Sequence, residues 1–278
     1  YSFQGNIESA RYDPRDLGFL QAPNEVSLNS TIGYYHFKPT PNLLQYNYRL
    51  NVYYSRMYDP GAYNRSFARA TGFWIFRNFW DITLTTGFFP SDHDYFVLGD
   101  PSTYRRFVKR PSYGYIESSG STDSRKKLYV RYSVLFANFL NSAPDKDYHA
   151  VEGGFRYRFS NRLTFDFSHR HEGETDFIIN AGRESNNEPI VAFVDFTDVT
   201  SILSGIYNFS PRINLTLRTR HYLSRVQFNR FANVDLKGNT VSRFGNTRYD
   251  NVNVFNLDAF LTWDFRPGSR LVAGYKNW

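Results

Sequence analysis

Alternation of apolar and polar residues at every second position is the feature that most constrains this chain. The segment 213–218, INLTLR, places Ile, Leu and Leu between Asn, Thr and Arg. A period of two puts these sets on opposite faces of a pleated strand. The same pattern recurs in other segments that we predict as strands, among them 43–56, 79–89, 127–140 and 253–265. The chain is therefore predicted to be all-β.

The predicted connections alternate strictly between long and short. About 13 strands are predicted, and the organising hairpin spans 202–226 with a tight turn at Ser210–Pro211. The long connections are 11–25, 57–65, 90–110, 141–147, 171–195 and 227–250; the short ones are 38–42, 77–78, 122–125, 160–162, 210–211 and 266–269. This order is typical of an up-and-down antiparallel β-barrel in an outer membrane. A soluble sandwich with Greek-key crossovers has no reason to alternate in this way.

Hydropathy and composition fit a membrane that is crossed by strands. Mean hydropathy is −0.53, and the longest apolar run has five residues, Ile190–Val194. A spanning helix needs about 20 apolar residues, whereas a tilted strand needs about 9–11. Aromatic residues reach 19% of the chain, which suits strands and membrane interfaces. We therefore predict a transmembrane β-barrel in the bacterial outer membrane, in contact with lipid. A soluble β-sandwich or a lipocalin-like barrel is the alternative.

Charged side chains recur on the polar face of the predicted strands. A dry sandwich core would have to pair each of them, whereas a water-containing lumen avoids that cost. The lumen-lining candidates are Arg49, Arg131, Arg156, Asp166, Arg218 and Asp258. The arginines could select anionic solutes, or they could brace the interior by pairing with acids such as Glu152. The net charge is +7, but the arginines follow strand spacing and do not cluster, so nucleic acid is not an expected partner.

The predicted strand number is odd. Closed bacterial barrels have even numbers of strands with both ends inside. The chain also opens directly in a strand-like segment, with no signal peptide before Tyr1. We therefore expect a single barrel domain, 1–278, that is part of a larger even-stranded barrel and lacks an N-terminal module and the last strands.

Four stretches carry a resemblance to a known family. They are YDPRDLGFL at Tyr12–Leu20, PSYGYIESSGSTDSRKK at Pro111–Lys127, the stretch Leu215–Arg225 with RTRHYLSR, and NVFNLDAFLTWDFRPGS at Asn253–Ser269. The chain resembles the C-terminal barrel region of the DUF5916 family of Bacteroidota outer-membrane proteins. The resemblance implies an outer-membrane barrel that follows a module similar to a family 9 carbohydrate-binding module. It implies no catalytic residues.

Two constellations could carry chemistry. Asp92–His93–Asp94 in a predicted loop could form a protease couple or a cation site, but we interpret it as a solvated polar loop because no second carboxylate pair can be placed opposite it. His169–Glu172 offers at most two imidazole ligands, and zinc needs three or four. A Ser-His-Asp arrangement stays open, since six His and many Ser allow many pairings. No catalytic residue, metal ligand or cofactor is assigned.

Loop aromatics are weaker candidates for contact with a ligand or a partner protein. They are Tyr95, Phe96, Tyr104, Phe107 and Phe231, all predicted to be exposed. Carbohydrate, an anionic solute and other envelope proteins are the partners considered beside lipid.

We expect a non-enzymatic outer-membrane protein. The barrel would serve as a pore for passive or assisted passage, or as a scaffold that holds a ligand-binding module at the membrane. The main alternative is a structural subunit of a larger outer-membrane complex, with a plugged barrel that conducts nothing. A hydrolase with its active site at the barrel rim is the third hypothesis.

Overall fold

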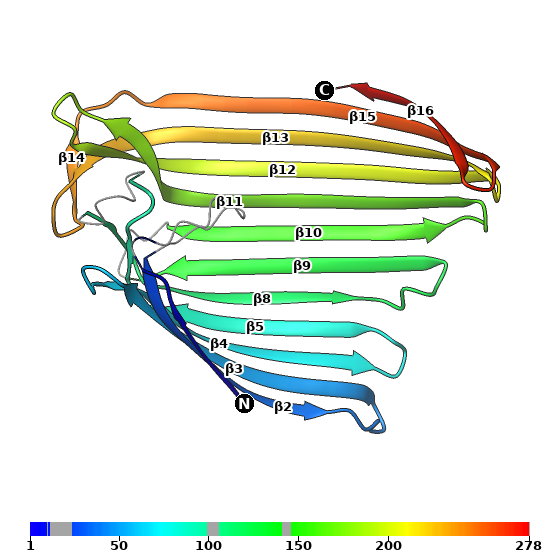
Figure 1. Ribbon diagram of the computed structural model, residues 1–278, viewed down its shortest axis with the longest axis horizontal. Coiled ribbons are helices and arrows are strands. Elements are labelled where there is room, and N and C mark those ends of the chain that lie inside the picture. Colours follow the sequence, from blue (N-terminus) through cyan, green and yellow to red (C-terminus); the bar gives the residue numbers. More distant parts are fainter. Residues whose placement is uncertain (10, 12–23, 99–105, 141–145, 278) are drawn as a thin grey trace.

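Antiparallel strands make up the regular structure of this protein (Figure 1). The computed structural model describes residues 1–9, 11, 24–98, 106–140 and 146–277. The strands of the first half are β1 (Ser2–Ile7), β2 (Glu25–His36), β3 (Leu43–Met57), β4 (Tyr63–Phe76), β5 (Asp81–Phe89), β6 (Asp92–Asp94), β7 (Val108–Arg110) and β8 (Tyr113–Ser121). Those of the second half are β9 (Leu128–Phe139), β10 (Asp147–Arg158), β11 (Leu163–Arg183), β12 (Pro189–Ser210), β13 (Ile213–Val234), β14 (Thr240–Arg243), β15 (Arg248–Arg266) and β16 (Ser269–Asn277).

The main sheet is an up-and-down meander of 14 strands. Its order is β1-β2-β3-β4-β5-β8-β9-β10-β11-β12-β13-β15-β16, and β14 pairs with β13 at the side of this path. The path holds 13 strands, which agrees with the predicted number, and the all-β antiparallel prediction is confirmed. The sheet is curved, with the first and last strands at its two edges (Figure 1). In the described residues β1 and β16 do not pair, so these strands form an open curved sheet rather than a closed barrel. The described residues include no helix long and apolar enough to cross a membrane.

Successive connections lie alternately at the two ends of the sheet, and the longest of them share one end (Figure 1). The predicted strict alternation of long and short connections is confirmed only in part, because 58–62 and 184–188 at that end are no longer than the turn 122–127 at the other. Two of the predicted loops are also wrong. Residues 171–183 and 189–195 belong to β11 and β12, and 227–234 belong to β13. The physical reason is a set of β-bulges, which shift the pairing between Glu174 and Phe177 and again between Phe193 and Val194. A bulge inserts one residue, so the period of two that marks a strand is interrupted.

Two further boundaries differ from prediction. The connection 90–110 contains the short strands β6 and β7, which pair with each other in a separate two-stranded sheet. Strand β15 begins at Arg248, five residues before the predicted start at Asn253. Most of the predicted loop 11–25 and of the loop 141–147 lies outside the described residues.

The two faces of the sheet differ in polarity and in exposure. Residues that lie opposite each other in the register share a face, and one face carries a continuous apolar band. Its exposed members include Leu28, Ile32, Tyr34, Tyr48, Leu50, Val52, Tyr54, Leu84, Phe88, Ile116, Val130, Tyr132, Phe136, Val151, Phe155, Leu203, Leu217, Phe255, Leu261 and Trp263. In β3, Tyr54 is 47% exposed, whereas Ser55 on the other face is fully buried. This is the inverse of a soluble protein, which buries its large apolar side chains.

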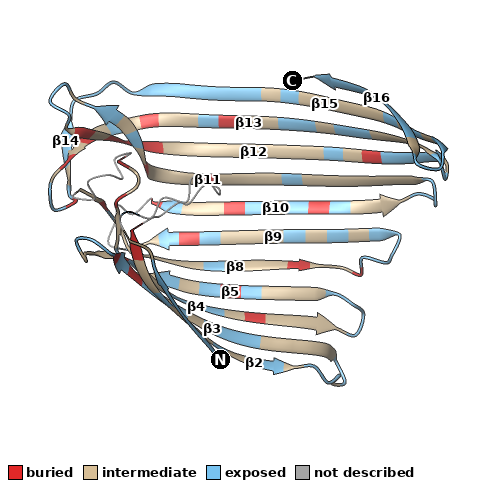
Figure 2. Ribbon diagram, in the orientation of Figure 1, coloured by how far each residue is buried: buried red, intermediate tan, exposed pale blue. Residues whose placement is uncertain are grey.

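Apolar residues are buried together only near the long connections. Figure 2 shows most of the buried positions at that end of the sheet, and single buried positions are scattered along strands such as β4, β8, β10, β12 and β13. One cluster joins Leu98 and Val108 to Ile178, Val191 and Val234. The sheet therefore has its apolar core at one end and not between two layers.

Candidate functional site

The connection between β5 and β8 folds onto strands far away in the sequence. Leu98 and Val108 pack against Ile178 of β11, Val191 of β12 and Val234 of β13. These contacts bury apolar surface at the ends of the three longest strands of the sheet. We call residues 90–98 together with 106–112 the β5–β8 connection.

Further contacts hold the first part of the connection near β3 and β4. Tyr95 packs against Met57 in a second buried cluster, and its hydroxyl donates to the Tyr63 carbonyl at 3.3 Å. The ring of His93 stacks on Phe107 with 4.0 Å between centroids. The connection thus bridges strands from both halves of the sheet.

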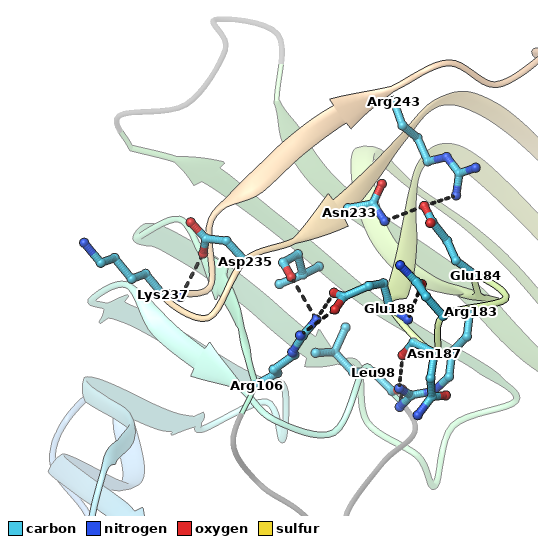
Figure 3. A network of polar contacts seen from close by, with 12 residues as sticks. Leu98, Arg106, Arg183, Glu184, Asn187, Glu188, Asn233, Asp235, Lys237 and Arg243 are labelled. Carbon is cyan, nitrogen blue, oxygen red and sulfur yellow. Dashed lines mark hydrogen bonds and ion pairs between the residues drawn. The ribbon is translucent and has the colours of Figure 1, made fainter.

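Polar contacts fix the connection to the turn between β11 and β12 (Figure 3). Arg106 forms a two-pronged ion pair with Glu188, in which Nη2 donates to Oε1 at 2.9 Å and Nη1 to Oε2. Arg183 donates from Nη2 to the Leu98 carbonyl at 3.3 Å. Bidentate pairs of this kind are among the stronger polar contacts, because both groups are charged and two parallel hydrogen bonds join them.

The same network continues into β13 and β14 (Figure 3). Glu184 accepts from Asn233 Nδ2 at 2.8 Å and pairs with Arg243 Nη1 at 3.0 Å. The network therefore links the ends of β11, β12, β13 and β14 to the β5–β8 connection.

A pocket of about 420 Å³ lies beside the connection. Asp92 of β6 and Arg110 of β7 line it together with residues from the sheet. Those residues are Phe89, Tyr113, Tyr115, Glu117, Leu135, Ala137, Phe139, Tyr148, Glu174 and Phe177. The register places these residues on the face opposite the apolar band, which we call the polar face. The volume and the mostly aromatic lining suit a small molecule.

Two carboxyl groups of the pocket are hard to ionise. Burial raises the pKa of Asp92 to about 6, although Arg110 and Arg65 act in the opposite direction. Burial likewise raises the pKa of Glu174 to about 7, against the nearby Lys146 and Arg110. Glu174 lies eleven residues past the start of β11 at Leu163, and about 9–11 residues of a tilted strand are enough to cross a membrane. Near neutral pH these groups change between donor and acceptor of hydrogen bonds.

Aromatic rings form a row across five neighbouring strands on the polar face. The row runs Tyr53, Phe67, Phe89, Tyr113 and Phe139, from β3 to β9. Successive ring centroids are 5.1, 4.9, 4.6 and 5.4 Å apart. The stacked pairs cover much of each other's faces, so we interpret the row as a rigid wall that ends in the pocket.

Three of the six lumen-lining candidates form one ionic cluster. Asp166 accepts from Arg131 Nη2 at 2.9 Å and Nη1 at 3.2 Å, and Arg156 Nε lies 3.5 Å from the same carboxylate. Arg131 reaches across β10 over Gly154, where an added Cβ would lie 3.0 Å from its Cζ. The hypothesis that interior arginines brace the sheet fits this cluster.

The other three candidates lie on the same face without joining that cluster. Arg218 and Asp258 are opposite each other in β13 and β15 and line a pocket of about 100 Å³. Arg49 of β3 is exposed and lies opposite Thr71 of β4. All six candidates therefore share the polar face; that they line a lumen stays a prediction.

The two histidine constellations do not assemble a site. Asp92, His93 and Asp94 lie in β6, where Asp94 pairs with Arg110 at 2.7 Å and His93 is packed between aromatic rings. The prediction of a solvated loop is wrong here, because these residues form a short strand that pairs with β7 and is half-buried. His169 and Arg170 point to opposite faces of β11, as neighbours in a strand must. The described residues contain no group of three or more His, Cys, Asp or Glu that could hold a metal ion.

The prediction of exposed loop aromatics is also wrong for the residues that the structure describes. Tyr95 is only 2% exposed, Phe96 and Phe107 pack with it, and Phe231 packs against the cluster around Phe228. Tyr104 lies outside the described residues. The sequence analysis did not find the pocket. A signal for it was the alternate apolar residues Leu135, Ala137 and Phe139, which continue the face of β9 that carries Arg131 and Ser133.

Comparisons with known proteins place the chain in a family. Residues 1–278 match the family described as domain of unknown function (DUF5916). Neither the comparison with curated proteins nor that with solved structures gives a significant match. Because the match covers every residue, the chain belongs to the DUF5916 family.

Proposed function

We propose that this protein is a non-enzymatic β-barrel of the bacterial outer membrane whose polar face borders a path for small solutes. The observation that carries the proposal is the inverted sheet, in which large apolar side chains are exposed on one face and charged ones lie on the other. Lipid requires such an apolar exterior, and it also requires a closed sheet in which every backbone group is paired. The proposal therefore includes closure of the edges at β1 and β16.

The β5–β8 connection is the element that restricts the path in this proposal. It lies beside a pocket on the polar face and is tied to β11–β13 by apolar packing and by the pair Arg106–Glu188. A segment that crosses between two halves of the sheet narrows any interior that they enclose. Loosening this attachment should widen the path.

Single-channel conductance in planar bilayers tests the function. The purified protein should give stable conductance steps, and the double variant Arg106→Gln/Glu188→Gln should give larger or noisier ones. The matched control is Asp264→Asn/Arg270→Gln, which removes an exposed ion pair at the short-turn end of the sheet and should leave the steps unchanged. Insertion is checked separately by heat-modifiable migration on a gel.

A plugged structural subunit is the second candidate. The buried apolar contacts of the connection favour it, because they hold the segment in place without the ion pair. Heat-modifiable, inserted protein that stays silent in both the wild type and the Arg106→Gln/Glu188→Gln variant would support the subunit and contradict the path.

A further inference from the structure

Three arginines of β3 and β4 lie on the polar face without an acidic partner in the part of the chain that the structure describes. Arg49, Arg65 and Arg69 are all exposed. Among the described residues, no carboxylate lies within the 4.0 Å that defines an ion pair for any of the three. This distinguishes them from Arg131, Arg156 and Arg170 on the same face of strands β9–β11, each of which contacts an acid.

Aromatic rings hold two of these guanidinium groups in place. The Cζ atom of Arg69 lies 5.6 Å from the ring centroid of Phe67, and Arg65 Cζ lies 5.5 Å from that of Tyr53. Stacking fixes the plane of a guanidinium and leaves its N–H edges accessible. In Arg69 one part of that edge already donates to the Tyr115 hydroxyl, and the other N–H groups are available. Such a group is preorganised for the two oxygens of a carboxylate, phosphate or sulfate, since less rotamer entropy is lost on binding.

The register brings Arg49 and Arg69 together. Asn51 lies opposite Arg69, and Arg49 lies opposite Thr71, so the two arginines are diagonal neighbours. Diagonal neighbours have Cα atoms about 7–8 Å apart, which is within reach of a common ligand for two long side chains. Thr71 adds a hydroxyl beside them, 3.4 Å from that of Thr85. Arg65 is four residues further along β4, about 13 Å away at the usual rise of a strand.

Acids on the polar face are too distant to neutralise this pair. In the row that starts at Arg49, the first carboxylate is Glu117, which follows Thr71 and Thr85. Three strand spacings separate Glu117 from Arg49, or about 14 Å. Among the described residues, the two positive charges therefore face the same space with no carboxylate in contact with either, and a bound anion would relieve their repulsion.

We propose that Arg49 of β3 and Arg69 of β4, together with Thr71 of β4, form a binding site for the oxyanion group of a small solute. Arg65 is a second contact along β4. The ligand class is a carboxylate, phosphate or sulfate ester or acid. The inference deepens the proposed function, because it names the solute class that the interior would attract. Binding itself requires neither conduction nor insertion, so it can be tested independently.

Isothermal titration calorimetry of the purified protein in detergent micelles tests the site. The probes are sodium glucuronate, inorganic phosphate and inorganic sulfate, with uncharged glucose as the matched sugar, all at low chloride to limit screening. At least one oxyanion should bind more tightly than glucose, and the ranking of the three identifies the oxyanion. The variant Arg49→Gln/Arg69→Gln should lower that affinity about tenfold or more.

Two further variants keep the result specific. Arg162→Gln/Arg212→Gln removes the same charge from two short turns and should retain the wild-type affinity. Arg69→Lys keeps the charge but loses the planar fork, so its affinity should lie between those of Arg69→Gln and the wild type. The proposal would be overturned if none of the three oxyanions bound more tightly than glucose. Equal affinities in the wild type and Arg49→Gln/Arg69→Gln would overturn it as well. A silent bilayer with intact oxyanion binding would reject the path and leave the site.

Discussion

The arginines of the polar face make different contacts in the two halves of the sheet. In β9–β11, Arg131, Arg156 and Arg170 contact Asp166, Glu152 or Glu172, and their side chains are 30–41% exposed. In β3 and β4, the arginines stack on aromatic rings or face Thr71 and have no carboxylate within 4.0 Å among the described residues. The same residue type therefore braces the sheet in one half and is left available in the other.

This difference predicts how the substitution of a charged side chain should affect stability and ligand binding in each half of the sheet. A paired arginine and its acid satisfy each other, so loss of one leaves the other without compensation. An exposed arginine without an acid is already hydrated, and its removal costs the fold little. Stability measurements should therefore respond in β9–β11, and ligand binding should respond in β3–β4.

The largest effect on stability is expected for Asp166→Asn. It leaves Arg131 and Arg156 close together with no carboxylate between them, so the free energy of unfolding should fall by about 1–2 kcal/mol. Equilibrium unfolding in urea, monitored in detergent micelles, measures it. Glu117→Gln removes the same charge from the same face and should change the free energy by less than about 0.5 kcal/mol. Equal changes in the free energy of unfolding for the two variants would contradict the distinction between the two halves of the sheet.

A pH effect should come from the pocket that lies between the halves. The pKa of Asp92 is about 6 in the folded protein and near its usual 3.8 when unfolded, so the folded state binds the proton more tightly. The contribution to stability is fully present below pH 3.8 and is lost as the pH rises to about 6. Asp92→Asn should flatten this part of the stability profile, by about 1–2 kcal/mol between pH 4 and 6.

The measurement is the urea midpoint at several pH values for the wild type and Asp92→Asn. Glu174, with a pKa of about 7, extends the same slope to higher pH and stays in both proteins. The difference between the two curves therefore isolates Asp92. Parallel curves from pH 4 to 8 would contradict a raised pKa for Asp92.

The fold could be predicted from the sequence where a strand keeps its period of two. The 13 strands of the path and their sequential order follow from alternation and turn residues. The ends of β11, β12 and β13 could not be predicted, because bulges such as that between Glu174 and Phe177 break the period. The packing of the β5–β8 connection depends on contacts 70 or more residues away, such as Leu98 with Ile178, which no local pattern encodes.

For the candidate site, the sequence predicts only on which face of the sheet each residue lies. Alternation places Arg49, Arg131 and Arg218 on one face, as the register confirms. Which arginine is paired depends on the register between strands, both adjacent ones, as for Arg156 and Asp166, and ones separated by a third strand. Arg131 meets Asp166 because β10 lies between them and presents Gly154, and a sequence cannot show that alignment in advance.

The smallest effect is expected for Arg69→Gln. Its guanidinium stacks on Phe67 but contacts no acid within 4.0 Å among the described residues, so the free energy of unfolding should change by less than about 0.5 kcal/mol. The same urea unfolding experiment as for Asp166→Asn measures it. A loss of 1 kcal/mol or more would mean that Arg69 braces the sheet as Arg131 does. A near-neutral change in the free energy of unfolding, together with weaker oxyanion binding, would show that Arg69 contributes to ligand binding and not to the stability of the fold.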